Sequence, residues 1–268
     1  MNVSTRSRIS LRVVALGYLV VLLVFPIVVI LYRTFGEGVG AFIDSVTTPA
    51  AISALQLSLL IVAIVVPVNV VFGVVTALAL VRGRFPGRRL IQGIVDLPFA
   101  ISPIIVGVSL IMLWGVHGWF GGIEKTGFKV IFALPGIVLA TIFVTLPFVV
   151  REVEPVLHEI GDDQEQAAAT LGASKWQTFW RITLPSIRWG LTYGIVLTVA
   201  RSLGEFGAVI IVSSNFAGSS RTLTLLVNDR YHAGRDFDAY AAATLLMGLA
   251  LVTLLAMTLL DRKRGAKQ

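Results

Sequence analysis

Arg201 and Glu205 are the two residues of this chain whose types and spacing best suit chemistry, because both stand inside an otherwise apolar segment. A charge near the centre of a bilayer costs several kcal/mol and usually faces the interior of a helix bundle. The spacing of four residues lets the guanidinium and the carboxylate pair on one helix face. Two interpretations follow: a structural ion pair that fixes helix packing, or an arginine that still attracts a passing anion.

Sequence patterns of hydrolytic enzymes are incomplete in this chain. The stretch that starts at His158-Glu159 begins like a zinc-protease helix, but Asp162 occupies the place of the second histidine ligand. Ser109 follows a Gly-Val pair as in intramembrane serine proteases, but Leu110 replaces the glycine that such a site requires. The chain contains no Gly-Lys dipeptide, hence no Walker A phosphate loop, and no cysteine nucleophile. We therefore predict that the chain is not an enzyme and that any ATP is hydrolysed by a partner.

The composition is typical of a membrane protein that crosses the bilayer several times. Hydrophobic residues make up 56% of the 268 residues and charged residues only 14%, too few for the surface of a soluble domain. About 20 apolar residues cover the roughly 30 Å hydrocarbon core as a helix. Six windows meet this condition: Val13–Tyr32, Ile52–Val81, Leu97–Val116, Val130–Val150, Trp189–Val212 and Ala239–Leu260. We expect six transmembrane helices in a single domain over residues 1–268, with the first helix retained rather than cleaved.

Basic residues predict which side of the membrane each loop faces. The N-terminus, the turn at 82–89, the loop at 151–188 and the C-terminal tail together carry 15 Lys and Arg residues, and the opposite loops carry six. The positive-inside rule places the first set, and therefore both termini, in the cytoplasm. The net charge of +7 is then a topology signal, and we expect no nucleic-acid partner.

The predicted cytoplasmic loop at 151–188 has the pattern of two short helices joined by a tight turn. Helix-forming residues run over 162–171, and Gly172 can adopt the left-handed conformation that ends a helix. Ser174 and Gln177 are spaced as a capping box for a second helix, and Pro185 suits the first turn of the next one. A rigid protrusion of this kind is typical of a docking element.

The same loop also fits an amphipathic helix that lies on lipid. Six acidic residues between Glu152 and Glu165 favour docking, since anionic headgroups would repel them. Trp176, Phe179 and Trp180 are expected to pack partly against the membrane helices. We therefore predict that the loop docks onto a cytoplasmic partner protein.

Two prolines near the start of the third apolar window predict a weak point in that helix. Asp96 and Pro98 are followed by Ser102 and Pro103, and each proline removes a backbone N–H donor. Freed backbone groups at membrane depth are tolerated where they pack in protein or line a watery path. The segment is therefore either a wall or gate of a translocation path or a simple proline kink, and the sequence leaves both open.

The loop resembles the EAA loop of ATP-binding-cassette (ABC) importer permeases, in which Glu-Ala-Ala precedes a spaced Gly and an Ile-x-Leu-Pro sequence. Gln166 stands where that family usually has Glu, and Glu165 is only a partial substitute because it points about 100° away around the helix. The resemblance implies that the pattern forms a coupling loop for an ATPase. Its residues are Gln166, Ala167, Ala168, Gly172, Ile182, Leu184 and Pro185.

Further segments look like the W-type permease subunits of bacterial sulfate/thiosulfate ABC importers, namely 66–73, 85–88, 96–103, 141–152 and 200–209. The resemblance implies an all-α membrane protein with the six-helix, type I (MetI-like) permease fold and a cytoplasmic coupling helix. The candidate path or gate residues are Asp96, Pro98, Ser102, Pro103, Arg201 and Glu205.

The same resemblance implies partners and a location. The partners are a second, T-type permease, two copies of a cytoplasmic ATPase subunit, an extracytoplasmic sulfate-binding protein and membrane lipid. ATP and Mg are then bound by the ATPase subunits, and we expect no cofactor on this chain. The location is the bacterial plasma membrane.

Two alternatives stay open at this stage. Molybdate or tungstate is the closest rival substrate, since the related permeases share much of the pattern around Arg201 and Glu205. A stand-alone secondary transporter would need inverted repeats and ion-coupling carboxylates, and the sequence contains neither pattern.

Overall fold

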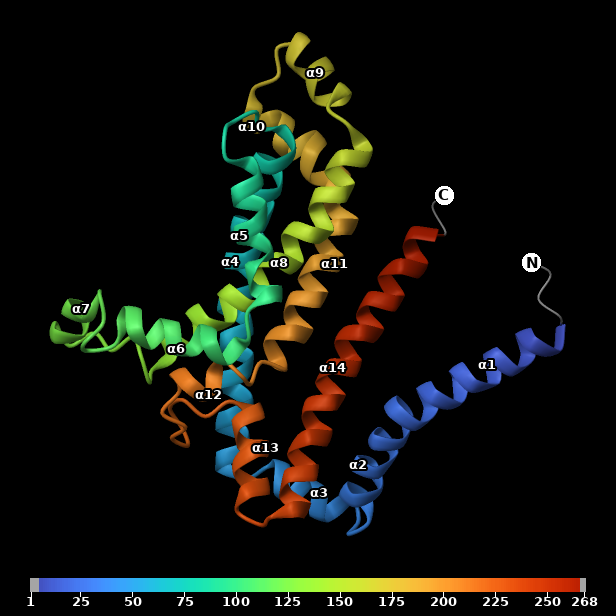
Figure 1. Ribbon diagram of the computed structural model, residues 1–268, viewed down its shortest axis with the longest axis vertical. Coiled ribbons are helices and arrows are strands. Elements are labelled where there is room, and N and C mark those ends of the chain that lie inside the picture. Colours follow the sequence, from blue (N-terminus) through green and yellow to red (C-terminus); the bar gives the residue numbers. More distant parts are fainter. Residues whose placement is uncertain (1–4, 266–268) are drawn as a thin grey trace.

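The computed structural model describes residues 5–265, and every regular element in this range is a helix (Figure 1). The first half contains α1 Thr5–Leu19, the π-helical turn η1 Val20–Val24, α2 Phe25–Phe35, α3 Val39–Val46, α4 Pro49–Arg82, α5 Arg88–Ala100, α6 Pro103–Trp114 and α7 Gly121–Lys125. The second half contains α8 Leu134–Ile160, α9 Asp163–Thr170, α10 Lys175–Thr178, the π-helical turn η2 Phe179–Thr183, α11 Leu184–Leu203, α12 Val209–Val212, α13 Leu223–His232 and α14 Asp236–Gly265. The expected all-α fold class is confirmed.

Four helical stretches within residues 5–265 are long and apolar enough to cross a membrane: Arg12–Phe35, Pro49–Arg82, Leu134–Ile160 and Asp236–Leu255. The expected third window is broken instead of continuous, because α5 and α6 meet at an angle of 113°. This pair counts as a fifth crossing if it is one broken span. The segment between them, which contains prolines, therefore forms a sharp bend and is not a loosened part of a straight helix.

The expected sixth window, Trp189–Val212, is not one helix. α11 ends at Leu203, and a turn that starts at Gly204 separates it from α12. Glycine is a poor helix former, and the carboxylate of Glu205 accepts a hydrogen bond from the backbone N–H of Ala208 at 2.9 Å, which stabilises the turn that precedes α12. The count of six crossings stays a prediction.

The centre of the bundle is formed by α4, α8 and α11, which run side by side (Figure 1). Glycines allow the backbones to approach closely, as is typical of helix pairs in membranes. A Cβ atom added at Gly73 would lie 2.6 Å from the Cβ of Val149, and one added at Gly190 would lie 2.5 Å from the carbonyl oxygen of Glu152. These contacts fix the relative positions of the three helices.

At the end of the bundle opposite α9, one buried arginine connects four helices. The guanidinium of Arg230 in α13 donates hydrogen bonds to the carbonyl of Ser45 and the hydroxyl of Thr48, each at 3.0 Å, and to the carbonyl of Asp238 at 3.0 Å. Burial lowers the pKa of Arg230, and the nearby carboxylate of Asp238 opposes that shift. The contacts join α3, the start of α4, α13 and the start of α14.

The first helical stretch leans away from the rest of the molecule, so that α1 and α14 diverge in Figure 1. None of the apolar window in Arg12–Phe35 is buried. Its far end is nevertheless held, because the hydroxyls of Thr34 in α2 and Thr244 in α14 lie 2.7 Å apart and are both buried.

Candidate functional site

The loop between α8 and α11 forms the predicted pair of short helices at one tip of the molecule (Figure 1). Gly172 has a φ of +84°, the left-handed conformation expected after α9. The capping box is present: Ser174 Oγ accepts the N–H of Gln177 at 3.3 Å, and Gln177 Oε1 accepts the N–H of Ser174 at 2.9 Å. Pro185 lies in the first turn of α11. The local predictions for this loop are therefore confirmed.

The outer surface of the loop is exposed and partly apolar. Gln166 and Ala167 are exposed, and Ala168 is half-buried. Leu171 at the turn is 88% exposed, so this apolar side chain is almost completely open to solvent. Leu171 is therefore available for contact with another molecule at the tip of the loop.

The three aromatic residues that were expected to pack partly against the membrane helices differ in their exposure. Trp176 and Trp180 are exposed by 69% and 51%. Their rings meet edge to face with centroids 5.5 Å apart, and Phe179 packs against the core. Leu171 and the two tryptophans are therefore exposed apolar residues of the same loop.

The final residues of the pattern connect the loop to the membrane helices. Ile182 and Leu184 are half-buried and Pro185 is exposed. Leu184 packs against the core cluster that α4, α8 and α11 share near the loop. These positions fix where the protrusion leaves the bundle.

A hydrogen-bonded clamp that the sequence did not predict holds α9. The carboxylate of Glu165 accepts from Arg82 Nε at 3.0 Å and from Thr183 Oγ1 at 2.8 Å. Arg82 also donates to the carbonyl oxygens of Leu157 and Gly161. The sequence offered one signal: an acidic residue in the first turn of a helix beside the coupling pattern, and a basic residue at the end of α4.

The first group of candidate path residues lies around the bend between α5 and α6. Asp96 is not free: its Oδ1 accepts from Arg151 Nη2 at 2.8 Å and from Nε at 3.1 Å. The guanidinium of Arg151 also lies 4.3 Å from the ring centroid of Phe99. Pro98 lies inside α5, and Ser102 and Pro103 start α6. These contacts tie α5 to α8 just before the bend.

The second group forms the predicted ion pair, with one correction. Arg201 Nη2 lies 2.9 Å from Glu205 Oε2, but Glu205 follows the end of α11 instead of lying on its face. The Glu205 side chain is 1% exposed and that of Arg201 is 35% exposed, so only the carboxylate is deeply buried. Thr224 Oγ1 donates to the carbonyl of Glu205 at 2.9 Å. The pair therefore fixes the turn between α11 and α12, and the guanidinium stays accessible.

The two breaks meet in space, because α6 packs on α12 (Figure 1). A Cβ atom added at Gly207 would lie 3.1 Å from the Cβ of Pro103. One added at Gly107 would lie 2.7 Å from the Cβ of Ile211 and 2.9 Å from the carbonyl oxygen of Ala208. The structure thus brings together the proline break and the Arg201–Glu205 break, which are about a hundred residues apart in sequence.

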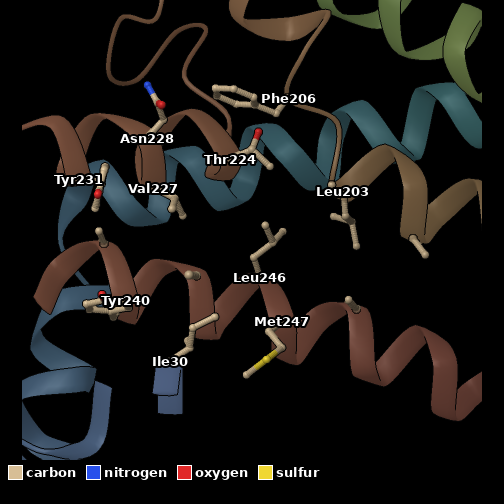
Figure 2. A pocket seen from close by; sticks show the side chains of 15 residues that line it. Ile30, Leu203, Phe206, Thr224, Val227, Asn228, Tyr231, Tyr240, Leu246 and Met247 are labelled. Carbon is tan, nitrogen blue, oxygen red and sulfur yellow. The ribbon is translucent and has the colours of Figure 1, made fainter. Parts of the chain in front are cut away.

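A cavity of about 700 Å³ lies beside the second break, between α2, α11, α13 and α14. Figure 2 shows that Leu203, Val227 and Leu246 point toward one another across it, and Met247 also lines it. No charged side chain lines it within the described residues. Its polar lining side chains are the neutral groups of Thr224, Asn228, Tyr231 and Tyr240.

Comparison with known proteins places this architecture in a family. Residues 69–265 match the family described as "Binding-protein-dependent transport system inner membrane component". The match covers most of the chain and includes the loop and both breaks. The chain belongs to this family. It is a membrane transport component, not a member of an enzyme family.

Individual relatives agree with this assignment. The chain is 47% identical over 252 residues to "Sulfate transport system permease protein CysW" of Synechocystis sp., covering 94% of this chain and 91% of the relative. It is 34% identical over 257 residues to "Sulfate transport system permease protein CysT" of Escherichia coli, covering 94% and 92%. The crystal structure of a bacterial ABC transporter involved in the import of alginate superposes with a TM-score of 0.76 at 18% identity, covering 95% and 93%. The structural likeness shows that the fold is that of an ABC-importer permease.

Proposed function

We propose that this chain is a transmembrane permease subunit of an ABC importer and forms part of the inward path for sulfate or thiosulfate. The observation that carries the proposal is the exposed helix–turn–helix loop with its left-handed Gly172, which matches the ATPase-coupling pattern residue by residue except at Gln166. The sulfate assignment is supported by the 47% identity to a CysW permease over nearly the whole chain.

The partners and the orientation are part of the proposal. A CysT-like permease would complete the membrane domain, two copies of an ATPase subunit would bind ATP and Mg in the cytoplasm, and a binding protein would deliver the anion from the other side. The excess of basic residues around the loop supports a cytoplasmic loop and cytoplasmic termini in the bacterial plasma membrane. The single domain over residues 1–268 is proposed on the same grounds.

The path itself is proposed to run past the two breaks. The contact between α6 and α12 can act as a gate, because short helices with glycine contacts can separate without unfolding a whole span. The half-exposed guanidinium of Arg201 offers attraction to a passing oxyanion, weakened by its pairing with Glu205. A weak site suits conduction, since the substrate must leave it again.

Reconstitution tests this function. The chain is co-expressed with a CysT-like permease, the ATPase subunit and the binding protein, and the complex is placed in proteoliposomes. We expect sulfate uptake that requires ATP and ATP hydrolysis that rises with the sulfate-loaded binding protein. The isolated chain is expected to hydrolyse no ATP. Uptake without the ATPase, or ATP turnover by the chain alone, would contradict the proposal, and stimulation only by molybdate or tungstate would reassign the substrate.

Replacing Gly172 with valine is expected to uncouple this transporter. No neighbouring atom lies within 4 Å of the added Cβ position, so the effect is purely one of backbone conformation. A β-branched residue at a φ of +84° is strained by about 1–3 kcal/mol, which distorts the turn between α9 and α10. We expect normal membrane insertion and loss of most ATP-driven uptake.

Gly172→Asn is the matched control, because asparagine adopts the left-handed conformation more readily. It is expected to keep most of the uptake. Equal uptake by the valine and asparagine variants would show that the turn conformation does not matter for coupling.

A further inference from the structure

Helix α9 is attached to the membrane helices by very few side chains. None of its residues is buried. Among the described residues, Glu165 is the one side chain of α9 that hydrogen-bonds to another helical segment, because the other bonded side chain, Thr170, bonds within α9 to the carbonyl of Ala167. Apolar packing therefore does little to hold α9 in place, and its position depends on what Glu165 contacts.

Both carboxylate oxygens of Glu165 are used. Oε2 lies 3.0 Å from Arg82 Nε at the end of α4, and Oε1 accepts from the hydroxyl of Thr183 at 2.8 Å, just before α11. Arg82 and Glu165 are about one-fifth exposed, and Thr183 is buried. Charge-assisted hydrogen bonds that are sheltered from water are shorter and stronger than those of a surface ion pair.

Arg82 extends the contact to α8. Its guanidinium donates to the carbonyl oxygens of Leu157 and Gly161, which belong to the last turn of α8 and the residue after it. Carbonyl groups at a helix end have no partner within the helix and carry the negative end of its dipole. The positive charge of Arg82 thus interacts favourably with the C-terminal ends of α4 and α8. The negative charge of Glu165 lies in the first turn of α9, where the helix dipole favours it.

We propose that Glu165 is a positioning residue for transport: it locks α9 to α4, α8 and α11, so that a displacement of α9 moves these helices as one body. The proposal rests on the proposed coupling function of the loop. In this chain the carboxylate is one position before Gln166, and it points toward the membrane helices while Gln166 is exposed. Glu165 therefore serves the transmission of movement within the chain, and the exposed surface at Leu171 and Trp176 serves contact with the ATPase.

The test measures sulfate uptake per ATP hydrolysed in the reconstituted complex, normalised to the amount of assembled complex. Glu165→Gln removes the charge and keeps the size of the side chain. We expect the ATPase subunits to co-purify and to hydrolyse ATP, while uptake per ATP falls about tenfold. Glu159→Gln is the matched control: it makes the same change at an exposed position near the end of α8, outside the clamp, and is expected to keep the wild-type ratio.

Two further variants make the test decisive. Thr183→Val removes one hydroxyl and should lower the same ratio. Arg82→Met combined with Glu165→Gln should be no worse than Arg82→Met alone, because Arg82→Met already removes the cation that Glu165 contacts. If Glu165→Gln fails to assemble, the comparison of Thr183→Val with wild type replaces it. A wild-type ratio in Glu165→Gln, or in its substitute, overturns this inference alone. A wild-type complex without ATP-driven uptake overturns the proposed function as well.

Discussion

Arg201→Met is expected to destabilise the assembled protein by about 3–5 kcal/mol, because it leaves the carboxylate of Glu205 buried without its cation. Glu205→Gln is expected to be less harmful. The guanidinium that it leaves behind is one-third exposed on this chain, whereas the Glu205 carboxylate is fully buried, and the glutamine carbonyl can still accept the N–H of Ala208. The measurement is the yield and thermal stability of the detergent-solubilised complex.

The double variant Arg201→Met with Glu205→Gln separates the two interpretations of the pair. It leaves no charge unpaired and keeps an acceptor for the N–H of Ala208, so we expect much of the assembly to return. A double variant that assembles and transports means that the pair is structural. One that assembles without transport means that Arg201 serves the anion. If Arg201→Met alone is as stable as wild type, the carboxylate is not stranded and this account of the turn is wrong.

Gly190→Ala is expected to lower the stability of the protein strongly, although it adds a single carbon. That carbon would lie 2.5 Å from the carbonyl oxygen of Glu152 and 2.9 Å from a methyl group of Val156, so α8 and α11 must move apart. Overpacking of this kind costs about 1–3 kcal/mol, occasionally more, and here it separates two central helices. We expect a clear drop in the thermal stability of the purified chain.

Gly93→Ala provides the control with the opposite sign. Gly93 lies in α5, and no atom lies within 4 Å of its added Cβ position. Alanine is the better helix former by about 1 kcal/mol, so this variant should be as stable as wild type or slightly more stable. Equal losses in both variants would show that the close approach of α8 and α11 is not what makes Gly190 sensitive.

The features that were predictable from the sequence are those fixed by neighbouring residues. The turn at Gly172 and the capping box of Ser174 and Gln177 depend on backbone conformation and contacts within a few residues, and both are present. The positions of the apolar helices follow from composition, and four of them are found as continuous candidates within the described residues. Local chemistry and hydropathy carry this information directly.

The features that were missed depend on contacts between distant segments. Apolarity alone does not reveal that α11 stops at Leu203, because the hydropathy continues beyond it. The close packing of α6 on α12 places two glycines, Gly107 and Gly207, against partners about a hundred residues away. The ion pair of Arg82 with Glu165 joins residues 83 positions apart, and no local pattern selects these two among the charged residues nearby.

The composition of α11 has a consequence for how the chain is made. α11 is 20 residues long, yet it is not among the helices apolar enough to cross a membrane by themselves. Gly190 and Gly194 on this helix fit directly against the backbone of α8. During synthesis α8 leaves the ribosome first, and it is one of the helices that can partition into lipid alone. We therefore expect an ordered biogenesis, in which α11 enters the bilayer by joining a helix already there, and a defect in α8 is expected to appear first as failed insertion of α11.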